Sequence, residues 1–261
     1  MKFARYQAQG KVSYGVVEGD VVKEMSGTPF EKYQLTGKSH KLSEVKLLAP
    51  CTPVKMLAMA LNYKSHLGDQ KPPDQPEPFF KVPTSIIGPG DTIILPKNAG
   101  RIDEEAELVV VIGRRCKGVS KADALKYVLG YTIGNDVSAR DFQLATSQWL
   151  MGKTFDGFAP TGPWITSADE IPDPHALDIE LFLNGERMQA SNTREMIFKI
   201  PDLIEFISSV LTLEPGDIVA TGTPAGVGFS KKPPRWLRPG DEVVVRIEGL
   251  GELRNPVAAE P

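Results

Sequence analysis

The chain has 261 residues with 24 glycines, 22 prolines and a formal net charge of −3. This length suits one large domain with a small appendage, and the nearly balanced charge excludes the basic surface of a nucleic-acid-binding protein. No apolar run approaches the roughly 20 residues that cross a bilayer, and the N-terminus lacks the apolar segment of a secretory signal. We therefore expect a cytoplasmic protein with neither a membrane nor a nucleic-acid partner.

The first 50 residues are predicted to form a small β domain, 1–50. Its expected strands, separated by glycine-containing turns, are Lys2–Ala8, Val12–Val17 and Val21–Glu24. We interpret residues 37–50 as a linker with one helical turn. Residues 51–261 form the main domain, where frequent glycine and proline favour short strands over long helices.

The main domain opens with an apolar strand at Val54–Ala60. His66 and Asp69 follow, and they would be neighbours on one face if this piece is a helical turn. A carboxylate that holds one imidazole nitrogen leaves the other free to act as a general base near neutral pH. Taken alone, a surface turn in which His66 only forms a hydrogen bond is the simpler interpretation.

A proline-rich loop follows His66 at residues 70–78. It is either a lid over a site or an inert surface connection. Residues 71–78, together with residues 148–151, are candidates for substrate selection because they lie next to other candidate site residues. Short strands are expected at Phe79–Lys81 and Thr92–Leu95.

The most informative segment is Arg101–Gly113. Residues Leu108–Ile112 are all apolar and mostly β-branched, which is typical of a strand buried on both faces. Because side chains alternate along a strand, Glu105 and Glu107 point to the same side. These carboxylates either form an exposed acidic rim or share a divalent metal ion, since buried like charges cannot both stay ionised without a cation.

A third carboxylate follows the next elements of the chain. Ser120 is predicted to cap a helix at Lys121–Leu129, with Gly130 as its stop. An apolar strand at Tyr131–Gly134 then leads to Asp136. The end of a strand suits a functional carboxylate, although an Asx turn or a helix cap would use the same residue type.

The second half of the chain is predicted to contain loops, strands and one helix. Residues 151–164 form a connection rich in glycine, proline and aromatic residues, and its Lys153 is either a solvated charge or an electrophile. Asn184-Gly185 is a strong hairpin signal, and the apolar spacing after Pro201 predicts an amphipathic helix to about Leu211. The expected strands are Asp178–Leu183, Glu186–Gln189, Ile218–Thr221, Glu242–Ile247 and Glu252–Val257.

Five motifs occur in order across residues 54–257. They are Asn62-Tyr63-x-x-His66, Glu105-x-Glu107-Leu108, Asn135-Asp136-x-Ser138-Ala139-Arg140-Asp141, Gly152-Lys153-x-Phe155-Asp156, and Pro215-Gly216-Asp217 followed by Thr221-Gly222-Thr223-Pro224-x-Gly226-Val227-Gly228. Any one of them alone is a weak signal. Together they closely resemble the fumarylacetoacetate hydrolase family, in its prokaryotic-type branch with a short N-terminal appendage.

The resemblance implies a mostly β, α+β fold with a mixed β-roll or β-sandwich core and a small N-terminal β appendage. It further implies a homodimer and a bound Mg2+ or Mn2+ ion, which Ca2+ can replace in a crystal. The implied metal ligands are Glu105, Glu107 and Asp136. The implied catalytic residues are His66 with Asp69 as the base that acts on water, and Lys153, which would stabilise an oxyanion. The residues expected to contact the substrate are Tyr63, Arg140, Gln143 and Thr223.

The implied substrate is a small 2-keto, 4-oxo carboxylic acid that chelates the metal and breaks down through an enolate. If His66 activates water, the reaction is hydrolysis of a carbon–carbon bond of an acylpyruvate, which is our main expectation. The alternatives are decarboxylation of an oxaloacetate-type acid, isomerisation of a 2-hydroxyhepta-2,4-diene-1,7-dioate type of substrate, and metal-dependent binding with weak catalysis. The family often has Glu where this chain has Asp69, one methylene shorter, so we expect a longer and weaker or water-bridged pairing with His66, which affects hydrolysis more than metal binding.

Overall fold

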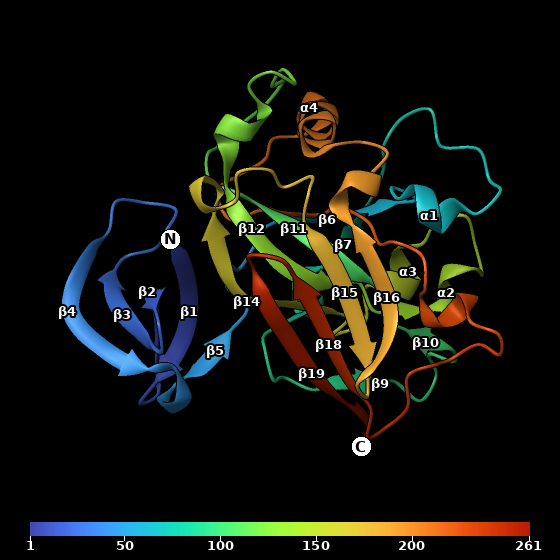
Figure 1. Cartoon of the computed structure of the whole chain (residues 1–261), viewed down its shortest axis with the longest axis horizontal. Coiled ribbons are helices and arrows are strands. Elements are labelled where there is room, and N and C mark those ends of the chain that lie inside the picture. Colours follow the sequence, from blue (N-terminus) through green and yellow to red (C-terminus); the bar gives the residue numbers. More distant parts are fainter.

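The computed structural model describes residues 1–261, and most of its regular structure is β-strand (Figure 1). The main path of the large sheet has, in spatial order, β4 (Gln34–Lys41), β3 (Val21–Ser26), β2 (Lys11–Glu18), β1 (Lys2–Ala8), β14 (Ala159–Ser167), β12 (Val128–Asn135), β11 (Ala106–Ile112), β17 (Ile218–Ala220), β6 (Met56–Ala60) and β7 (Glu77–Lys81). Two further strands lie beside this path. β5 (Lys46–Leu48) pairs with β1, and β8 (Ile86–Ile87) pairs with β14.

A second sheet packs in front of the large one in Figure 1. Its spatial order is β16 (Glu186–Asn192), β15 (Asp178–Leu183), β18 (Glu242–Ile247), β19 (Gly251–Ala259) and β9 (Ile93–Leu95). A separate short pair consists of β10 (Ile102–Asp103) and β13 (Ser138–Ala139). These mixed sheets confirm the expected mostly β fold.

The α-helices are few and mostly a single turn. They are α1 (Lys64–Leu67), α2 (Arg140–Gln143), α3 (Leu150–Lys153) and α4 (Ile200–Val210). None of them has the length and apolar character needed to cross a membrane. The predicted amphipathic helix is confirmed as α4, which buries Leu203, Ile204 and Ile207 against the body of the protein.

The first 50 residues extend the large sheet, because β1 pairs with β14 through Lys2 opposite Thr166. Figure 1 shows β1–β4 (blue) as a group at one side of the molecule. The prediction of a linker at residues 37–50 was wrong: most of this segment belongs to β4 and β5, with one helical turn between them. β4 is an edge strand whose side chains are nearly all exposed, so its composition is as polar as that of a loop.

The helix predicted at Lys121–Leu129 was also wrong. The segment contains only a short 3-10 turn at Ala124–Tyr127, and β12 begins directly after it. Val128 pairs with Ile112 of β11. Local helix propensity is a weak influence that sheet pairing overrides here.

The hairpin around Asn184-Gly185 is confirmed, with β15 and β16 joined by this turn. Both turn residues have positive φ, 53° and 82°, as a two-residue turn of this kind requires. Residues 159–164 were predicted as part of a connection, but they lie in β14. Pro160 and Pro163 hid this strand, because proline cannot donate to a sheet and argues against a central position.

The centre of the large sheet positions the candidate site. Every residue of β11 is buried, between β12 on one side and β17 on the other. β11 and β12 are antiparallel, and Ala106 lies opposite Asn135. The start of β11 therefore meets the end of β12, which brings the candidate carboxylates of both segments to the same place.

Gly130 is predicted to be essential for this arrangement, because a Cβ atom there would lie 2.1 Å from the carbonyl oxygen of Thr166 in β14. We expect Gly130→Ala to reduce the free energy of unfolding by about 3 kcal/mol or more, since neither strand can move aside. Gly118→Ala is the control: its Cβ would meet no atom, and its positive φ of 61° costs about 1 kcal/mol. Urea denaturation of both variants measures this, and equal losses would contradict the prediction.

Candidate active site

Three predicted carboxylates come together at the junction of β11 and β12. Glu105 directly precedes β11 and Asp136 directly follows β12, and the Asp136 amide donates to the Glu105 carbonyl at 2.9 Å. Glu107 points to the same side as Glu105, as strand alternation requires. One oxygen from each of the three side chains lies within 4.8 Å of the others, and all three side chains are buried. The sequence prediction that these residues form one cluster is confirmed.

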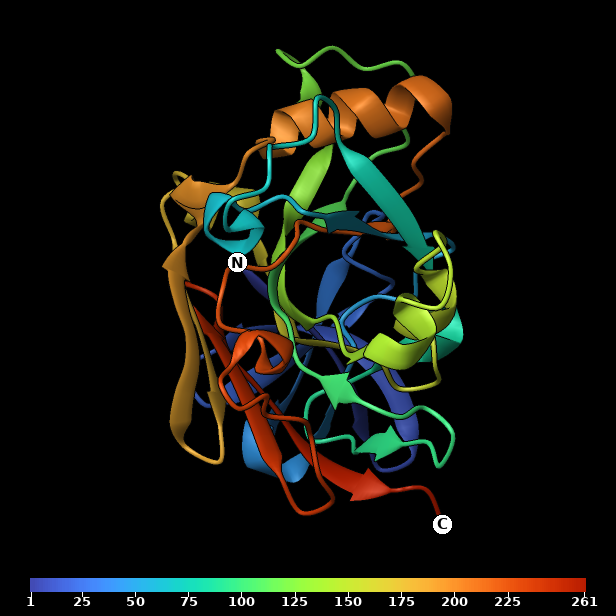
Figure 2. The same ribbon diagram turned by 90° about the vertical axis from the view of Figure 1, so that its right-hand side faces the viewer.

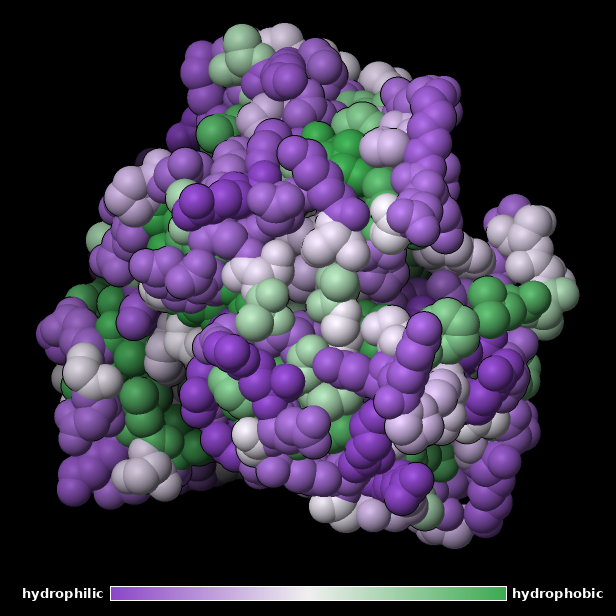
Figure 3. Space-filling model, turned by 45° about the vertical axis from the view of Figure 1, so that its right-hand side comes forward, coloured by the Kyte–Doolittle hydropathy of each residue, from purple (hydrophilic) through white to green (hydrophobic).

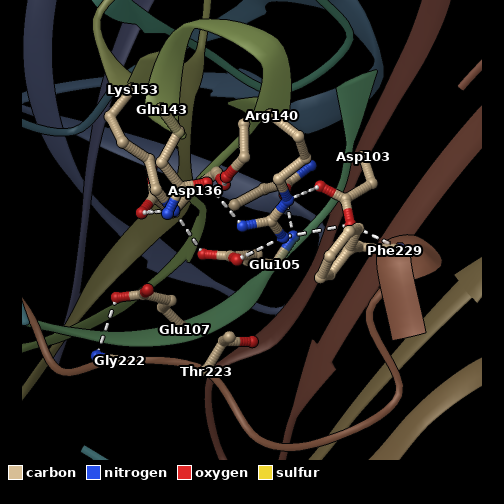
Figure 4. Close-up of polar contacts among 12 residues, drawn as sticks. Asp103, Glu105, Glu107, Asp136, Arg140, Gln143, Lys153, Gly222, Thr223 and Phe229 are labelled. Atoms are coloured by element: carbon tan, nitrogen blue, oxygen red, sulfur yellow. Dashed lines mark hydrogen bonds and ion pairs between the residues drawn. The ribbon is translucent and has the colours of Figure 1, made fainter. Parts of the chain in front are cut away.

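Two of the carboxylates are paired with buried cations (Figure 4). The Lys153 Nζ atom lies 2.6 Å from Glu105 Oε2 and 2.8 Å from Asp136 Oδ2. Arg140 Nη2 lies 2.6 Å from Glu105 Oε1. Burial alone would raise the pKa of Glu105, but Lys153 and Arg140 bring it below its usual range. Glu105 is therefore held ionised.

Glu107 differs because no cation pairs with it. Its Oε2 atom accepts only from the Gly222 amide, at 2.9 Å, as the single dashed line to this residue in Figure 4 shows. Burial, followed by repulsion from Asp136 and Glu105, raises the pKa of Glu107 well above its usual value. A hard divalent cation takes carboxylate oxygens as ligands. Glu105, Glu107 and Asp136 therefore fit such an ion, and Glu107 supplies the negative charge that the protein leaves unpaired.

A pocket lies beside the cluster, and its walls come from distant parts of the chain. Figure 2 shows α1 (cyan) and the α2–α3 segment (yellow-green) at separate places around the central strands, and both contribute to the lining. The polar lining residues are His66, Glu105, Asp136, Arg140, Gln143, Lys153 and Thr223, and the apolar ones are Met59, Ala60, Leu61, Phe79 and Trp149. The side of the molecule that carries these helices is mostly hydrophilic, with apolar residues in separate groups (Figure 3).

Hydrogen bonds orient two of the predicted substrate-contacting side chains. The Oε1 atom of Gln143 accepts from Arg140 Nη1 at 2.8 Å, so its two N–H donors remain for a ligand. The hydroxyl oxygen of Thr223 accepts from Gln189 Nε2 at 2.9 Å, which leaves its O–H to donate. Arg140 is more restricted, because its Nε and Nη2 atoms also donate to Asp103 at 2.7 and 3.0 Å.

The structure does not bring Asp69 to His66. His66 lines the pocket, whereas Asp69 is exposed and makes no hydrogen bond or ion pair. α1 ends at Leu67, and Gly68 then adopts a φ of 57°, so the helical spacing that would align the two residues is lost. Tyr63 does not line the pocket either: its side chain is fully buried, and burial followed by the charge of Glu107 raises its pKa.

Sequence reasoning missed three buried charged residues near the cluster. Asp103 alternates with Glu105 and Glu107 along the same segment, so the strand period already contained this signal. Lys81 donates to Asp136 Oδ1, and its only sequence signal was a charge beside two phenylalanines. Glu104 is fully buried, and neither of its carboxylate oxygens has a hydrogen-bond partner. No sequence signal distinguished it from a surface glutamate.

The comparison with protein families agrees with this arrangement. Residues 55–258 match the family described as Fumarylacetoacetate (FAA) hydrolase C-terminal. The chain belongs to the fumarylacetoacetate hydrolase family. Residues 1–50 match a second family, described as Rv2993c-like, N-terminal.

Several relatives are named for isomerase chemistry, and two solved structures, at 34% and 30% identity, are named a fumarylacetoacetate hydrolase and a maleylpyruvate hydrolase. The mitochondrial oxaloacetate tautomerase FAHD2B of Bos taurus is 49% identical over 220 residues, which cover 82% of this chain and 70% of the relative. The solved 5-carboxymethyl-2-hydroxymuconate delta-isomerase of Mycobacterium smegmatis is 41% identical, with a TM-score of 0.91 and full coverage of both chains. The 2-hydroxyhepta-2,4-diene-1,7-dioate isomerase of Mycobacterium marinum is 40% identical, with a TM-score of 0.90 over 100% of this chain and 99% of that one.

Glu104 should make the stability of the protein pH-dependent. Burial and then repulsion from Asp103 raise its pKa from 4.5 to about 8. Between these pH values the folded state binds more protons than the unfolded state, so stability falls as pH rises, by up to roughly 5 kcal/mol. We expect Glu104→Gln to raise Tm strongly at about pH 8.5 and little at about pH 5.

Calorimetric melting at both pH values measures this effect of Glu104. The control is Glu44→Gln, which changes an exposed glutamate without any hydrogen bond or ion pair and should shift Tm little at either pH. A Tm gain for Glu104→Gln that is equal at the two pH values would contradict the raised pKa.

Metal binding should depend on Glu107. Because a ligand that binds only the folded state raises its stability, Mn2+ should raise Tm of the wild type and bind with a measurable Kd. We expect Glu107→Gln to lose most of this affinity, whereas Glu104→Gln, the same change at a buried neighbour outside the cluster, should keep it. Affinity should also rise with pH, because the proton held by Glu107 must leave before the metal binds. Isothermal titration calorimetry tests this, and wild-type affinity in Glu107→Gln would refute the assignment.

Proposed function

We propose that this protein is a metal-dependent isomerase that moves a proton between the oxygen and the carbon of a small enolic 2-keto dicarboxylic acid. Keto–enol tautomerisation of oxaloacetate is the simplest reaction of this class. The proposal is supported by the 49% identity to a relative named oxaloacetate tautomerase and by full-length similarity to two solved isomerases. It replaces hydrolysis, our main expectation from the sequence, with one of its alternatives.

The observation that carries the proposal is that no carboxylate is hydrogen-bonded to the ring of His66. Hydrolysis requires a water molecule that is oriented and deprotonated, usually by an imidazole that a carboxylate holds in place. His66 reaches the pocket, but its ring has no hydrogen-bond partner, and Asp69 lies exposed outside the lining. A proton transfer to or from a bound substrate needs only an imidazole within reach of it. This pocket therefore suits isomerisation better than attack by water.

The proposed reaction conserves every atom of the substrate. The hydroxyl on C2 of the enol loses its proton, the pair of the O–H bond forms the C2=O double bond, and the pair of the C2=C3 double bond takes up a proton at C3 to give the keto acid. His66 is the residue that carries the proton. Lys153 is fully buried beside the cluster and donates toward the developing oxyanion, which is stabilised most in a site that excludes water. A divalent ion held by Glu105, Glu107 and Asp136 would supply further positive charge for the same oxygen.

The remaining pocket residues suit a second carboxylate. The free N–H donors of Gln143 and the hydroxyl of Thr223 are oriented by their own hydrogen bonds, as described above. Preoriented donors hold an anion with little loss of side-chain freedom. On the apolar side, the rings of Phe79 and Trp149 meet edge to face with centroids 6.1 Å apart. We propose that this wall contacts the carbon chain of the acid.

The first experiment is to compare two reactions of the same enzyme preparation. Conversion of enol- to keto-oxaloacetate, followed by the ultraviolet absorbance of the enol, should be accelerated by the wild type with Mg2+ or Mn2+. Cleavage of acetylpyruvate should be much slower. Glu107→Gln at the same metal concentration corrects for catalysis by free metal. Faster cleavage of acetylpyruvate than tautomerisation would refute the proposal in favour of a hydrolase, and release of CO2 as the main reaction would favour a decarboxylase.

Variants of the two candidate catalytic residues and of Asp69 sharpen this test. We expect Lys153→Met and His66→Ala to lower kcat by about a hundredfold or more, as is typical when a proton carrier or an oxyanion donor is removed. Asp69→Asn should keep wild-type kcat, because this carboxylate does not reach His66. A large loss of activity in Asp69→Asn would show that the two residues act together and would restore the hydrolase interpretation.

A further inference from the structure

Lys81 is one of two buried lysines in the protein, and the proposed reaction assigns it no role. It is the last residue of β7, and its side chain is 0% exposed. Phe79 lies two positions earlier and lines the pocket, so strand alternation directs both side chains to the same face of the sheet. A fully buried lysine is costly unless it is paired. The groups that pair with Lys81 therefore indicate its role.

The ammonium group of Lys81 joins two residues of the candidate site. It donates to Asp136 Oδ1 and to the backbone carbonyl of Lys153. The other oxygen of Asp136, Oδ2, is the one that pairs with the Lys153 ammonium, at 2.8 Å. The next residue, Val82, also donates its amide to the Thr154 hydroxyl at 3.0 Å. The end of β7 is thus bonded to the end of α3 at two points.

We propose that Lys81 is a positioning residue for both Asp136 and Lys153, an inference that rests on the metal-dependent site of the proposed function. The final torsion of an aspartate side chain is broad and roughly two-fold, so a free carboxylate could turn either oxygen toward the cluster. Lys81 holds Oδ1 and leaves Oδ2 toward the cluster. Its bond to the Lys153 carbonyl places the end of α3, from which the Lys153 ammonium reaches the pocket.

No other side chain contacts the Oδ1 atom of Asp136, so no neighbour takes over the positioning contact of Lys81. The carboxylate group of Asp136 pairs with Lys81 and Lys153 only, and both of these lysines are buried. Partners that hold a metal-ligating side chain in place typically change metal affinity by about ten- to a hundredfold. The inference therefore predicts an effect on metal binding that does not depend on which substrate is used.

The test compares Lys81→Met with Lys55→Met. Lys55 pairs with the buried Asp217 at 2.8 Å and is not part of the pocket lining, so each variant removes one lysine from a buried aspartate. Isothermal titration of the metal-free proteins with Mn2+ should show a Kd about ten- to a hundredfold higher for Lys81→Met and unchanged for Lys55→Met. Damage that only reduced the amount of folded protein would lower the number of sites and leave the Kd of the remaining sites unchanged.

A second variant keeps the test possible when the first one is not folded. If Lys81→Met does not fold, Lys81→Gln, which keeps one donor group but not the charge, is titrated in the same way and should also show weaker Mn2+ binding. A Kd within twofold of the wild-type value in the folded variant would overturn the inference. Weaker binding in the variant combined with no tautomerisation by the wild type would reject the proposed function alone, because the Mn2+ titration involves no substrate.

Discussion

The structure depends on the neutralisation of buried charge where β11 begins and β12 ends. Burying a charge costs several kcal/mol unless it is paired. The carboxylates of this network are Asp103, Glu105, Glu107 and Asp136, and the cations are Lys81, Arg140 and Lys153. The cations pair with every carboxylate except Glu107. With Glu107 ionised, the network is one positive charge short, which is why the site suits a divalent cation that replaces the proton of Glu107.

The sheet makes this concentration of charge possible by fixing the register of its strands. A slip of one residue would turn Glu105 and Glu107 to the opposite face, but β11 is bonded on both sides, to β12 and to β17. Gly222, which follows β17, has a φ of 92°, and a Cβ there would lie 3.0 Å from Cβ of Asn62. In this conformation, which favours glycine, its amide donates to Glu107 Oε2 at 2.9 Å.

The fold does not decide the reaction, and we propose that a few side chains at the edge of this network select it. Solved structures with nearly the same backbone include the isomerases described above, and the family is named for a hydrolase. Here Lys153 and the carboxylate cluster are tightly held, whereas His66 lacks a carboxylate partner. Stabilising an enolate needs only Lys153 and the carboxylate cluster, whereas activating water also needs an imidazole that is held by a carboxylate. We therefore propose that the surroundings of His66 distinguish isomerisation from hydrolysis.

Features that depend on local periodicity were predicted correctly from the residues alone. Strand alternation placed Glu105 and Glu107 on one side, the Asn184-Gly185 turn defined a hairpin, and apolar spacing identified α4, because each of these follows from neighbours along the chain. The remaining features follow from contacts between segments that are far apart in the chain. The exposure of Asp69 follows from the backbone of Gly68, and Lys81 meets residues 55 and 72 positions away. Contacts between such distant segments, and the burial that makes a charge costly, are set by the packing of strands, which no local pattern contains.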